Sequence, residues 1–144
     1  MAAPTRDSAK DISLGTGSWS GGFSDGTTLW FIDLTPSVMD AIAYTASTLA
    51  RNSTFDVDFG DGNWTGGAYA NGTIWVVDNT GDEAVAYTAS TRARDSSKDI
   101  SLSPSITWTG GFSDGTTLWF VDDNNNIAKA YTASTRARDR KSVV

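Results

Sequence analysis

The sequence GGFSDGTTLWFVD, at residues 110–122, decides the fold of this chain. Its first eleven residues recur unchanged at 21–31, and the related sequence GGAYANGTIWVVD occupies 66–78. Each copy has apolar residues on both sides of an Asp-Gly or Asn-Gly pair, which is the strongest short-range indication of a β-hairpin. A type I′ turn suits these pairs, because it requires positive φ at both central residues. We therefore predict three repeats, each built on one hairpin.

The repeat has a period close to 44 residues. Trp19, Trp64 and Trp108 follow one another at intervals of 45 and 44 residues. The sequence AYTAST also occurs once in each repeat, at 43–48, 86–91 and 130–135. Several short strands at this period are expected of a β-propeller blade.

The predicted fold class is all-β, with three four-stranded propeller blades in a single domain over residues 1–144. The expected parts are an N-terminal strand at 10–14 and blades at about 18–59, 63–102 and 107–144. In the third repeat the first three strands are expected at 108–113, 116–122 and about 127–133, and the fourth strand is a KDISL-type segment, as at 98–102.

Two local features refine this prediction. The turn of the second repeat moves by one residue to Asn71-Gly72, so we expect a bulge or a change of register there. A helix over 41–50 is the main alternative to a strand, but the repeated Tyr-Thr-Ala-Ser-Thr sequence favours a strand followed by a turn.

The second strand of each hairpin indicates how the sheets pack. Residues 29–32 (LWFI) and 74–77 (IWVV) show no alternation of apolar and polar side chains. Both faces of such a strand are expected to be buried. A blade with neighbours on both sides satisfies this requirement, whereas a sheet covered on one side does not.

The repeat resembles bacterial β-propeller repeats of the type SDGTTLWV-D followed by YAYDLATGARDSSKD, which are similar in style to the NHL and YVTN repeats. The resemblance rests on SDGTTLWFVDDNNNIAKAYTASTRARD at 113–139 and on STRARDSSKD at 90–99. It implies a binding or scaffold role and an extracellular location for the parent family. The family's Asp-Leu-Ala-Thr-Gly turn is Thr-Ala-Ser-Thr here, without Gly, so this connection is expected to be built differently.

Composition excludes several classes of function. The 144 residues contain no cysteine and no histidine, which removes disulfides, thiolate metal sites, the commonest zinc ligand and the usual general base. A formal charge of −6 argues against a nucleic-acid or anionic-membrane surface. No secretion signal is visible in MAAPTRDSAK, at 1–10, and no cofactor is expected.

Three blades are too few for a ring, because propellers have 4–8. We therefore expect a homodimer that closes a six-bladed ring about a two-fold axis, with a nine-bladed trimer as the less favoured alternative. Residues 11–14 are predicted to pair with the third strand of the partner's third blade. The alternative is that residues 141–144 fill that edge within their own chain.

One rim of the propeller is the predicted ligand site, since the first strand begins there and the second strand ends there. Aromatic faces beside carboxylates and amides are what carbohydrate recognition uses, and repetition would make it multivalent. The alternative is that each Trp is a wedge between blades and each Asp caps its turn. The predicted residues are Trp19, Trp64, Trp108, Asp33, Asp78 and Asp122.

Two other groups of polar residues are candidates for a metal site and for ion pairs or anion binding. Asp122, Asn124 and Asn126 could surround a Ca²⁺, as could the segment 58–63, but neither has the spacing of a calcium loop, and Asn and Asp are common in turns. On the opposite rim, arginines that follow the third strand are expected to pair with aspartates of the hairpin turns or to bind an anion. These residues are Arg92, Arg94, Arg136, Arg138, Asp25 and Asp114.

The favoured function is a non-enzymatic binding or scaffold module, with multivalent carbohydrate binding as its specific form. No catalytic residue is predicted, because triads need His or Cys and near-identical repeats do not make one asymmetric site. The alternatives are a purely structural repeat protein of designed, ancestral or metagenomic origin, and a carboxylate-based glycosidase or lyase.

Overall fold

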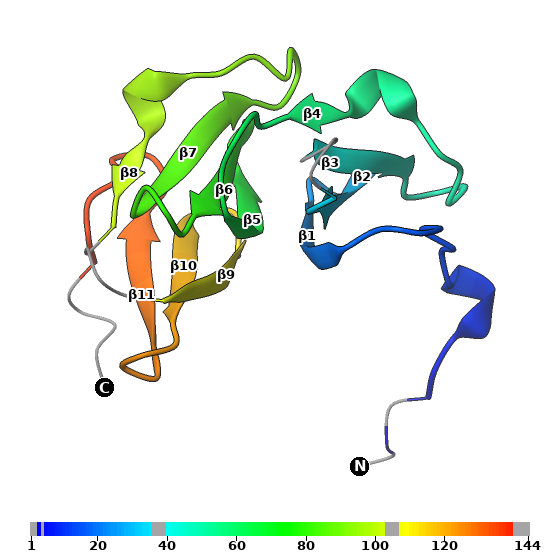
Figure 1. The fold of residues 1–144 in the computed structure, drawn as a ribbon, viewed down its shortest axis with the longest axis horizontal. Coiled ribbons are helices and arrows are strands. Elements are labelled where there is room, and N and C mark those ends of the chain that lie inside the picture. The colour runs from blue at the N-terminus through cyan, green and yellow to red at the C-terminus, as the bar shows by residue number, and fades with distance from the viewer. Residues whose placement is uncertain (1–2, 4, 36–39, 103–106, 140–144) are drawn as a thin grey trace.

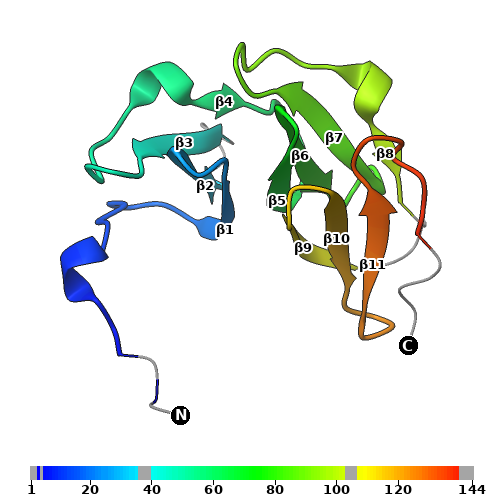
Figure 2. The ribbon, with the colours of Figure 1, turned by 180° about the vertical axis from the view of Figure 1, so that it is seen from behind.

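The computed structural model describes residues 3, 5–35, 40–102 and 107–139. Within them the chain forms three antiparallel sheets that follow one another along an arc (Figure 1 and Figure 2). These residues also form three short 3₁₀ helices: η1 (Ser8–Lys10) precedes the first sheet, and η2 (Ser53–Phe55) and η3 (Ser96–Lys98) connect the third and fourth strands of the first and second sheets. No helix in the described part of the chain has the length and hydropathy needed to cross a membrane.

The strands occur in the order that the repeat predicts. The first sheet contains β1 (Trp19–Ser24), β2 (Thr28–Asp33), β3 (Asp40–Thr45) and β4 (Val57–Asp58). The second contains β5 (Trp64–Ala70), β6 (Thr73–Asp78), β7 (Glu83–Thr88) and β8 (Ile100–Ser101). The third contains β9 (Trp108–Ser113), β10 (Thr117–Asp122) and β11 (Ile127–Thr132). The helical alternative over 41–50 is therefore wrong, and the third sheet has three strands among the described residues instead of four.

Residues 11–14, predicted to pair with a second copy, form no strand within the described part of the single chain. They follow η1 and lead towards β1 at the edge of the arc, away from the third sheet (Figure 1). The rival strand at 141–144 lies outside the described residues.

The hairpin turns are of two kinds. In the second sheet Asn71 and Gly72 have φ of 50° and 77°, the two positive values that the predicted type I′ turn requires. In the first and third sheets only the glycines are left-handed, Gly26 at 93° and Gly115 at 99°, so the type I′ prediction is wrong there. The Asp25 carboxylate stabilises the first of these turns by accepting the backbone N–H groups of Thr27 and Thr28.

Every sheet has a bulge near the start of its innermost strand. The register shifts between Trp64 and Gly67 in the second sheet and at the equivalent positions of the other two, whereas the pairing beside the Asn71-Gly72 turn, where we expected the irregularity, is regular. Gly66 and Gly110 lie in these bulges with φ of 158° and 149°. A Cβ on Gly66 would lie 2.7 Å from the Cα of Gly110, so β5 and β9 touch backbone to backbone.

Two apolar cores fill the spaces between the sheets. The second sheet is buried on both faces, as predicted: Ile74 and Val76 of β6 pack towards the first sheet, and Trp75 and Val77 pack towards the third. The alternating faces of β2 and β10 are buried on one side only. Each outer sheet therefore has one packed face and one open face.

Candidate functional site

The six residues of the predicted rim site form three cross-strand pairs. At the bulged end of each hairpin, a tryptophan that opens the first strand faces an aspartate that ends the second strand. The pairs are Trp19 with Asp33, Trp64 with Asp78, and Trp108 with Asp122.

Two of the three tryptophans lie between the sheets. Trp108 is 0% exposed and Trp64 is 3% exposed, and each belongs to a core between neighbouring sheets. The Trp64 indole N–H donates to the carbonyl of Gly60 at 3.2 Å. Trp19 is half-buried, and its indole nitrogen is buried without a partner among the described residues. This packing supports the interpretation of the tryptophans as wedges between blades.

The aspartates of the first two pairs hold the chain at the rim. Asp33 accepts the backbone N–H groups of Ser18 and Thr35 and the Thr35 hydroxyl, at 3.1, 2.9 and 2.6 Å. Burial raises the pKa of Asp33, but these hydrogen bonds from Thr35 and Ser18 outweigh it and leave the pKa below its usual value. Asp78 accepts two backbone N–H groups in the same way. Their geometry agrees with the turn-capping interpretation.

The carboxylate of Asp122 is paired with the ammonium group of Lys129. This carboxylate accepts the backbone and side-chain N–H groups of Asn125 and lies 2.8 Å from the Nζ of Lys129, which sits over the Trp108 ring. Burial raises the pKa of Asp122, and the contacts with Lys129 and Asn125 reverse this and lower it. The ammonium group of Lys129 therefore neutralises a carboxylate that the candidate Ca²⁺ site would use. No group of three or more acidic, His or Cys side chains in the described part of the chain is arranged to hold a metal.

The open faces are built from the same positions as the packed ones. The open face of the first sheet presents Trp19, Leu29, Phe31, Ile42 and Ala46; Tyr44 lies on the same face but is only 8% exposed. Their equivalents in the second sheet are the core residues Trp64, Ile74, Val76, Val85, Tyr87 and Ala89. The open face of the first sheet is therefore of the same kind as the face of the second sheet that packs against the first.

The third sheet exposes the opposite type. Its open face presents Phe112, Trp119, Val121 and Ala128. Phe112 is 54% exposed and stacks on Trp119 with 5.3 Å between ring centroids. In the first sheet, Phe23 stacks on Trp30 at the same distance, but Phe23 lies against Gly67 of the second sheet. The third sheet presents the same arrangement without a sheet to cover it.

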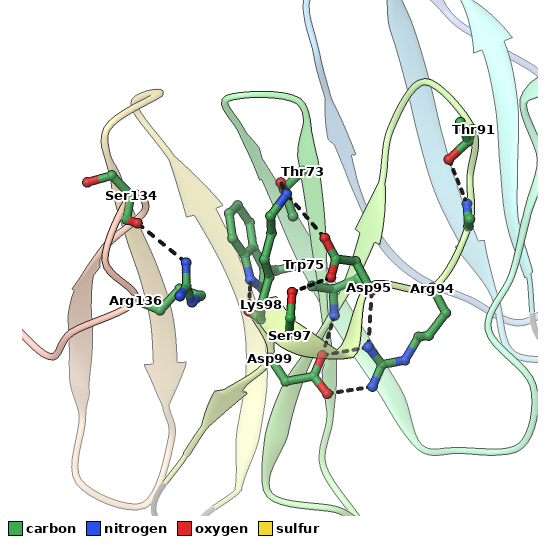
Figure 3. A network of polar contacts seen from close by, with 12 residues as sticks. Thr73, Trp75, Thr91, Arg94, Asp95, Ser97, Lys98, Asp99, Ser134 and Arg136 are labelled. Atoms are coloured by element: carbon green, nitrogen blue, oxygen red, sulfur yellow. Dashed lines mark hydrogen bonds and ion pairs between the residues drawn. The ribbon is translucent and has the colours of Figure 1, made fainter.

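The fourth strand of a sheet is held by a recurring set of polar contacts (Figure 3). In the second sheet, Trp75 donates its indole N–H to the carbonyl of Lys98 at 2.9 Å. Asp99 accepts the N–H of Ala86 at 2.9 Å and makes two hydrogen bonds with Arg94, at 2.6 and 2.5 Å. The first sheet repeats all of these contacts.

This set corrects one prediction. The arginines after the third strand do not pair with the aspartates of the hairpin turns; Arg51 and Arg94 pair with Asp56 and Asp99, five residues further along the chain. The hairpin carboxylate of Asp25 is instead used within its own turn, at 2.8 and 2.7 Å from two backbone nitrogens.

A hollow of about 150 Å³ lies over the innermost strands β1, β5 and β9. Phe23, Tyr69 and Phe112 supply aromatic surface to it, and Ser24 and Ser113 supply hydroxyl groups. No charged side chain lines it. The hollow is therefore suited to a small, neutral group with both apolar and hydroxyl surface.

No family model matches the sequence, and no curated protein matches it. Solved structures do. The glutaminyl cyclase of Myxococcus xanthus superposes with a TM-score of 0.67 at 14% identity, over 84% of this chain and 50% of that one. The hydrazine synthase of Kuenenia stuttgartiensis gives 0.64 at 12% identity, over 94% and 38%. The β-propeller domain of Myceliophteria thermophila Cps50 (Swd1) gives 0.57 at 7% identity, over 90% and 40%.

At these identities the likeness concerns the fold alone. This chain spans half or less of the length of each of those structures. Its three antiparallel sheets match part of a β-propeller, which is the conclusion that the comparisons and the strand order support together.

Proposed function

We propose that this chain is a non-enzymatic scaffold and binding module that supplies half of a six-bladed propeller. Two copies complete the ring when the open face of each third sheet covers the open face of the other copy's first sheet. The proposal rests on one observation. The open face of the first sheet has the same positions as the face that the second sheet packs against the first, and the open face of the third sheet has the same positions as the face that the second sheet packs against the third.

The energetics favour this association. Phe112, Trp119 and Val121 on one face, and Leu29 and Phe31 on the other, are large apolar side chains that water reaches in the single chain. Burying each of them contributes about 1.5–3 kcal/mol, and a two-fold ring forms the contact twice. The gain is set against the loss of translational and rotational freedom, of about 4–15 kcal/mol. The sum leaves a stable dimer.

Sedimentation equilibrium tests the proposal. The expected mass is about 31 kDa, twice the 15.3 kDa of one chain, at micromolar concentration. Phe31→Asp and Val121→Asp each place a charge on one open face and should give a folded species of 15.3 kDa. Ser134→Asp adds the same charge at an exposed position away from both faces and should leave the dimer intact. A well-folded monomer of the unaltered chain at tens of micromolar would refute the proposal.

Carbohydrate binding is the second candidate, and the hollow supports it better than the rim does. In the closed ring Trp19 takes the buried environment of Trp64 and Trp108, which leaves no tryptophan face for a sugar. Tyr69, by contrast, lies at the hollow with its ring half-buried. A glycan array tests the idea: binding that Tyr69→Ala removes, at unchanged stability, supports it, and no binding at millimolar sugar removes it.

A further inference from the structure

We propose that residues 8–14 of one chain dock on the third sheet of a second copy, with Ile12 and Ser13 as its fourth strand, and that Asp11 then exchanges Arg6 for Arg138 of that copy. This inference rests on the proposed ring and names the segment that fastens it. The segment itself, the edge that receives it, and the polar and apolar groups on both sides are all described residues.

The N-terminal segment is a third copy of the closing motif. RDSAKDI at 6–12 corresponds to RNSTFDV at 51–57 and to RDSSKDI at 94–100. In the first two sheets this motif passes through η2 or η3 into the fourth strand. The residue after η1, Asp11, has φ −67° and ψ 141°, close to the −60° and 149° of its equivalent Asp99. The motif is therefore already in its closing conformation, without a sheet to join.

Among the described residues, no strand pairs with the outer edge of β11 in the third sheet. In the second sheet, Ile100 and Ser101 of β8 pair with Ala84 and Glu83 of β7. The same register in the third sheet places Ile12 of the second copy opposite Ala128, and Ser13 opposite Ile127, on β11. The backbone groups of this edge then gain the hydrogen bonds that an edge strand lacks.

The polar groups of the third sheet are also in place. Arg138 lies over the ring of Tyr131 at 5.7 Å and donates to the carbonyl of Ala130 at 3.1 Å. The equivalent Arg94 has the corresponding values of 5.8 and 3.2 Å, and in addition binds its aspartate. Five positions after Arg138, where that aspartate would be, the sequence has Val143. Asp11 of a second copy supplies the carboxylate, both to Arg138 and to the N–H of Ala130.

The docked segment also provides a hydrogen-bond acceptor, the carbonyl of Lys10, for the indole N–H of Trp119. Trp30 and Trp75 donate their indole N–H groups to the carbonyls of Phe55 and Lys98, at 2.8 and 2.9 Å. Their equivalent, Trp119, has no such acceptor among the described residues. The carbonyl of Lys10 takes this position when the segment docks.

The apolar side chains of the segment complete the open face. Val57 and Phe59 after η2, and Ile100 and Leu102 after η3, are buried in the cores between sheets. Ile12 and Leu14 hold the equivalent positions but are only half-buried in the single chain. Docked on the third sheet, they would lie beside Trp119 and Val121 and be buried like their counterparts.

The contact that the segment gives up is a weak one. Arg6 and Asp11 form an ion pair whose side chains are 79% and 48% exposed. Exposed pairs of this kind contribute little, because water and salt screen them. The pair formed by Arg94 and Asp99 is less exposed, at 38% and 21%, so the exchange moves Asp11 to a better-shielded partner.

Engineered cysteines test the pairing directly, since the chain has none of its own. Ser13→Cys with Ile127→Cys places two thiols opposite each other across the proposed strands, within the reach of a disulfide. Mild oxidation should give a covalent dimer of about 31 kDa on a denaturing gel. Glu83→Cys with Ser101→Cys is the matched control: it has the same register inside one chain and should lose its free thiols while remaining at 15.3 kDa.

The outcomes separate this inference from the proposed ring. If the cysteine variant sediments as a dimer but forms no crosslink, or crosslinks only within one chain, the ring stands and the strand exchange is refuted. If the unaltered chain is a monomer, the ring itself fails. An interchain crosslink in high yield in the dimer supports both.

The exchange of arginines has its own readout. Asp11→Ala and Arg138→Ala should each raise the dimer dissociation constant about tenfold, and the double variant should raise it no further, because both remove one interaction. Arg6→Ala should leave the dissociation constant unchanged. A tenfold loss with Arg6→Ala and none with Arg138→Ala would refute the exchange.

Discussion

The carboxylate of Asp122 lies 2.8 Å from the Nζ of Lys129, and the side chains of both are largely withdrawn from water at the junction of the second and third sheets. The equivalent positions to Lys129 are Ile42 and Val85, so the third sheet alone has a cation there. A buried pair of this kind loses much more stability when one partner is removed than an exposed pair does.

Lys129→Met should therefore destabilise the chain by about 2 kcal/mol, because Asp122 is left with only the donors of Asn125. Urea unfolding at fixed protein concentration measures this. Lys98→Met, which removes a half-exposed ion pair with Asp95, is the control and should cost less than about 1 kcal/mol. Since the folded-state pKa of Asp122 is lowered, the deficit of Lys129→Met should be full above the unfolded pKa of 3.8 and disappear as the pH falls below it.

Asp40 should make stability depend on pH in the opposite sense. Burial, followed by the charges of Asp58, Asp56 and Asp33, raises its pKa to about 6. A raised folded-state pKa favours the protonated form, so stability is lost as the pH rises from 3.8 through 6. Asp40→Asn should thus be more stable than the unaltered chain by about 1 kcal/mol at pH 8, after allowance for solvent screening, and equally stable at pH 3.

Thermal unfolding at the two pH values measures the effect of Asp40→Asn. Asp61→Asn removes the same charge from an exposed loop and is the control. An equal gain from Asp61→Asn would attribute the effect to net charge rather than to the carboxylates around Asp40.

The turn after the third strand should be improved by glycine. Leu49, Arg92 and Arg136 take φ of 60°, 60° and 61° at the position where the resembling family has Gly. A left-handed conformation costs a non-glycine residue about 1–2 kcal/mol. Arg136→Gly should therefore stabilise the chain by about 0.5 kcal/mol after the entropy of glycine is subtracted. Ala137→Gly, the next residue, should destabilise it; a loss of stability in both variants would contradict the strain argument.

The contact between the innermost strands should be sensitive to one methyl group. Gly66→Ala places a Cβ 2.7 Å from the Cα of Gly110 and should destabilise the chain by about 3 kcal/mol. Gly26→Ala meets nothing within 4 Å and suffers only the cost of its φ of 93°, so it should lose about 1 kcal/mol. Equal losses in the two variants would show that the strands do not touch.

Substitution of Trp64 distinguishes the two interpretations of the rim tryptophans, as wedges between blades or as a ligand-binding surface. As a wedge, Trp64→Ala should cost about 3–5 kcal/mol in unfolding free energy, because it leaves a large cavity between the first two sheets. Calorimetry measures this. Retained stability together with lost glycan binding would restore the surface site predicted from the sequence.

Much of the fold could be predicted because the repeats are nearly identical and the hairpins are marked by aromatic and β-branched residues. The strand expected at 108–113 has those bounds in the structure. The turn type could not be predicted from Asp-Gly alone, because the Asp25 side chain competes for the backbone donors and closes a longer turn. Asn71, with no carboxylate, forms the expected turn.

The site was harder to predict, because accessibility depends on the neighbouring sheet. The pairing of Trp64 with Asp78 followed from the repeat, but the burial of Trp64 comes from residues of another blade. The arginine partners were missed although the sequence contained their signal: Arg and Asp recur five positions apart at 6 and 11, 51 and 56, and 94 and 99. Position 143, five residues after Arg138, is a valine, so the third repeat lacks this aspartate in its own sequence.

The backbone contact at Gly66 and Gly110 also has a consequence for stoichiometry. The innermost strands can approach this closely only because Gly66 has no side chain: its Cβ would lie 2.7 Å from the Cα of Gly110, whereas a Cβ on Gly110 would meet only the carbonyl oxygen of Thr65, at 3.6 Å. In the proposed two-fold ring, a bulkier residue at 66 would widen this step and prevent two copies from meeting at both ends. The two complementary open faces would then add further copies into an open fibre.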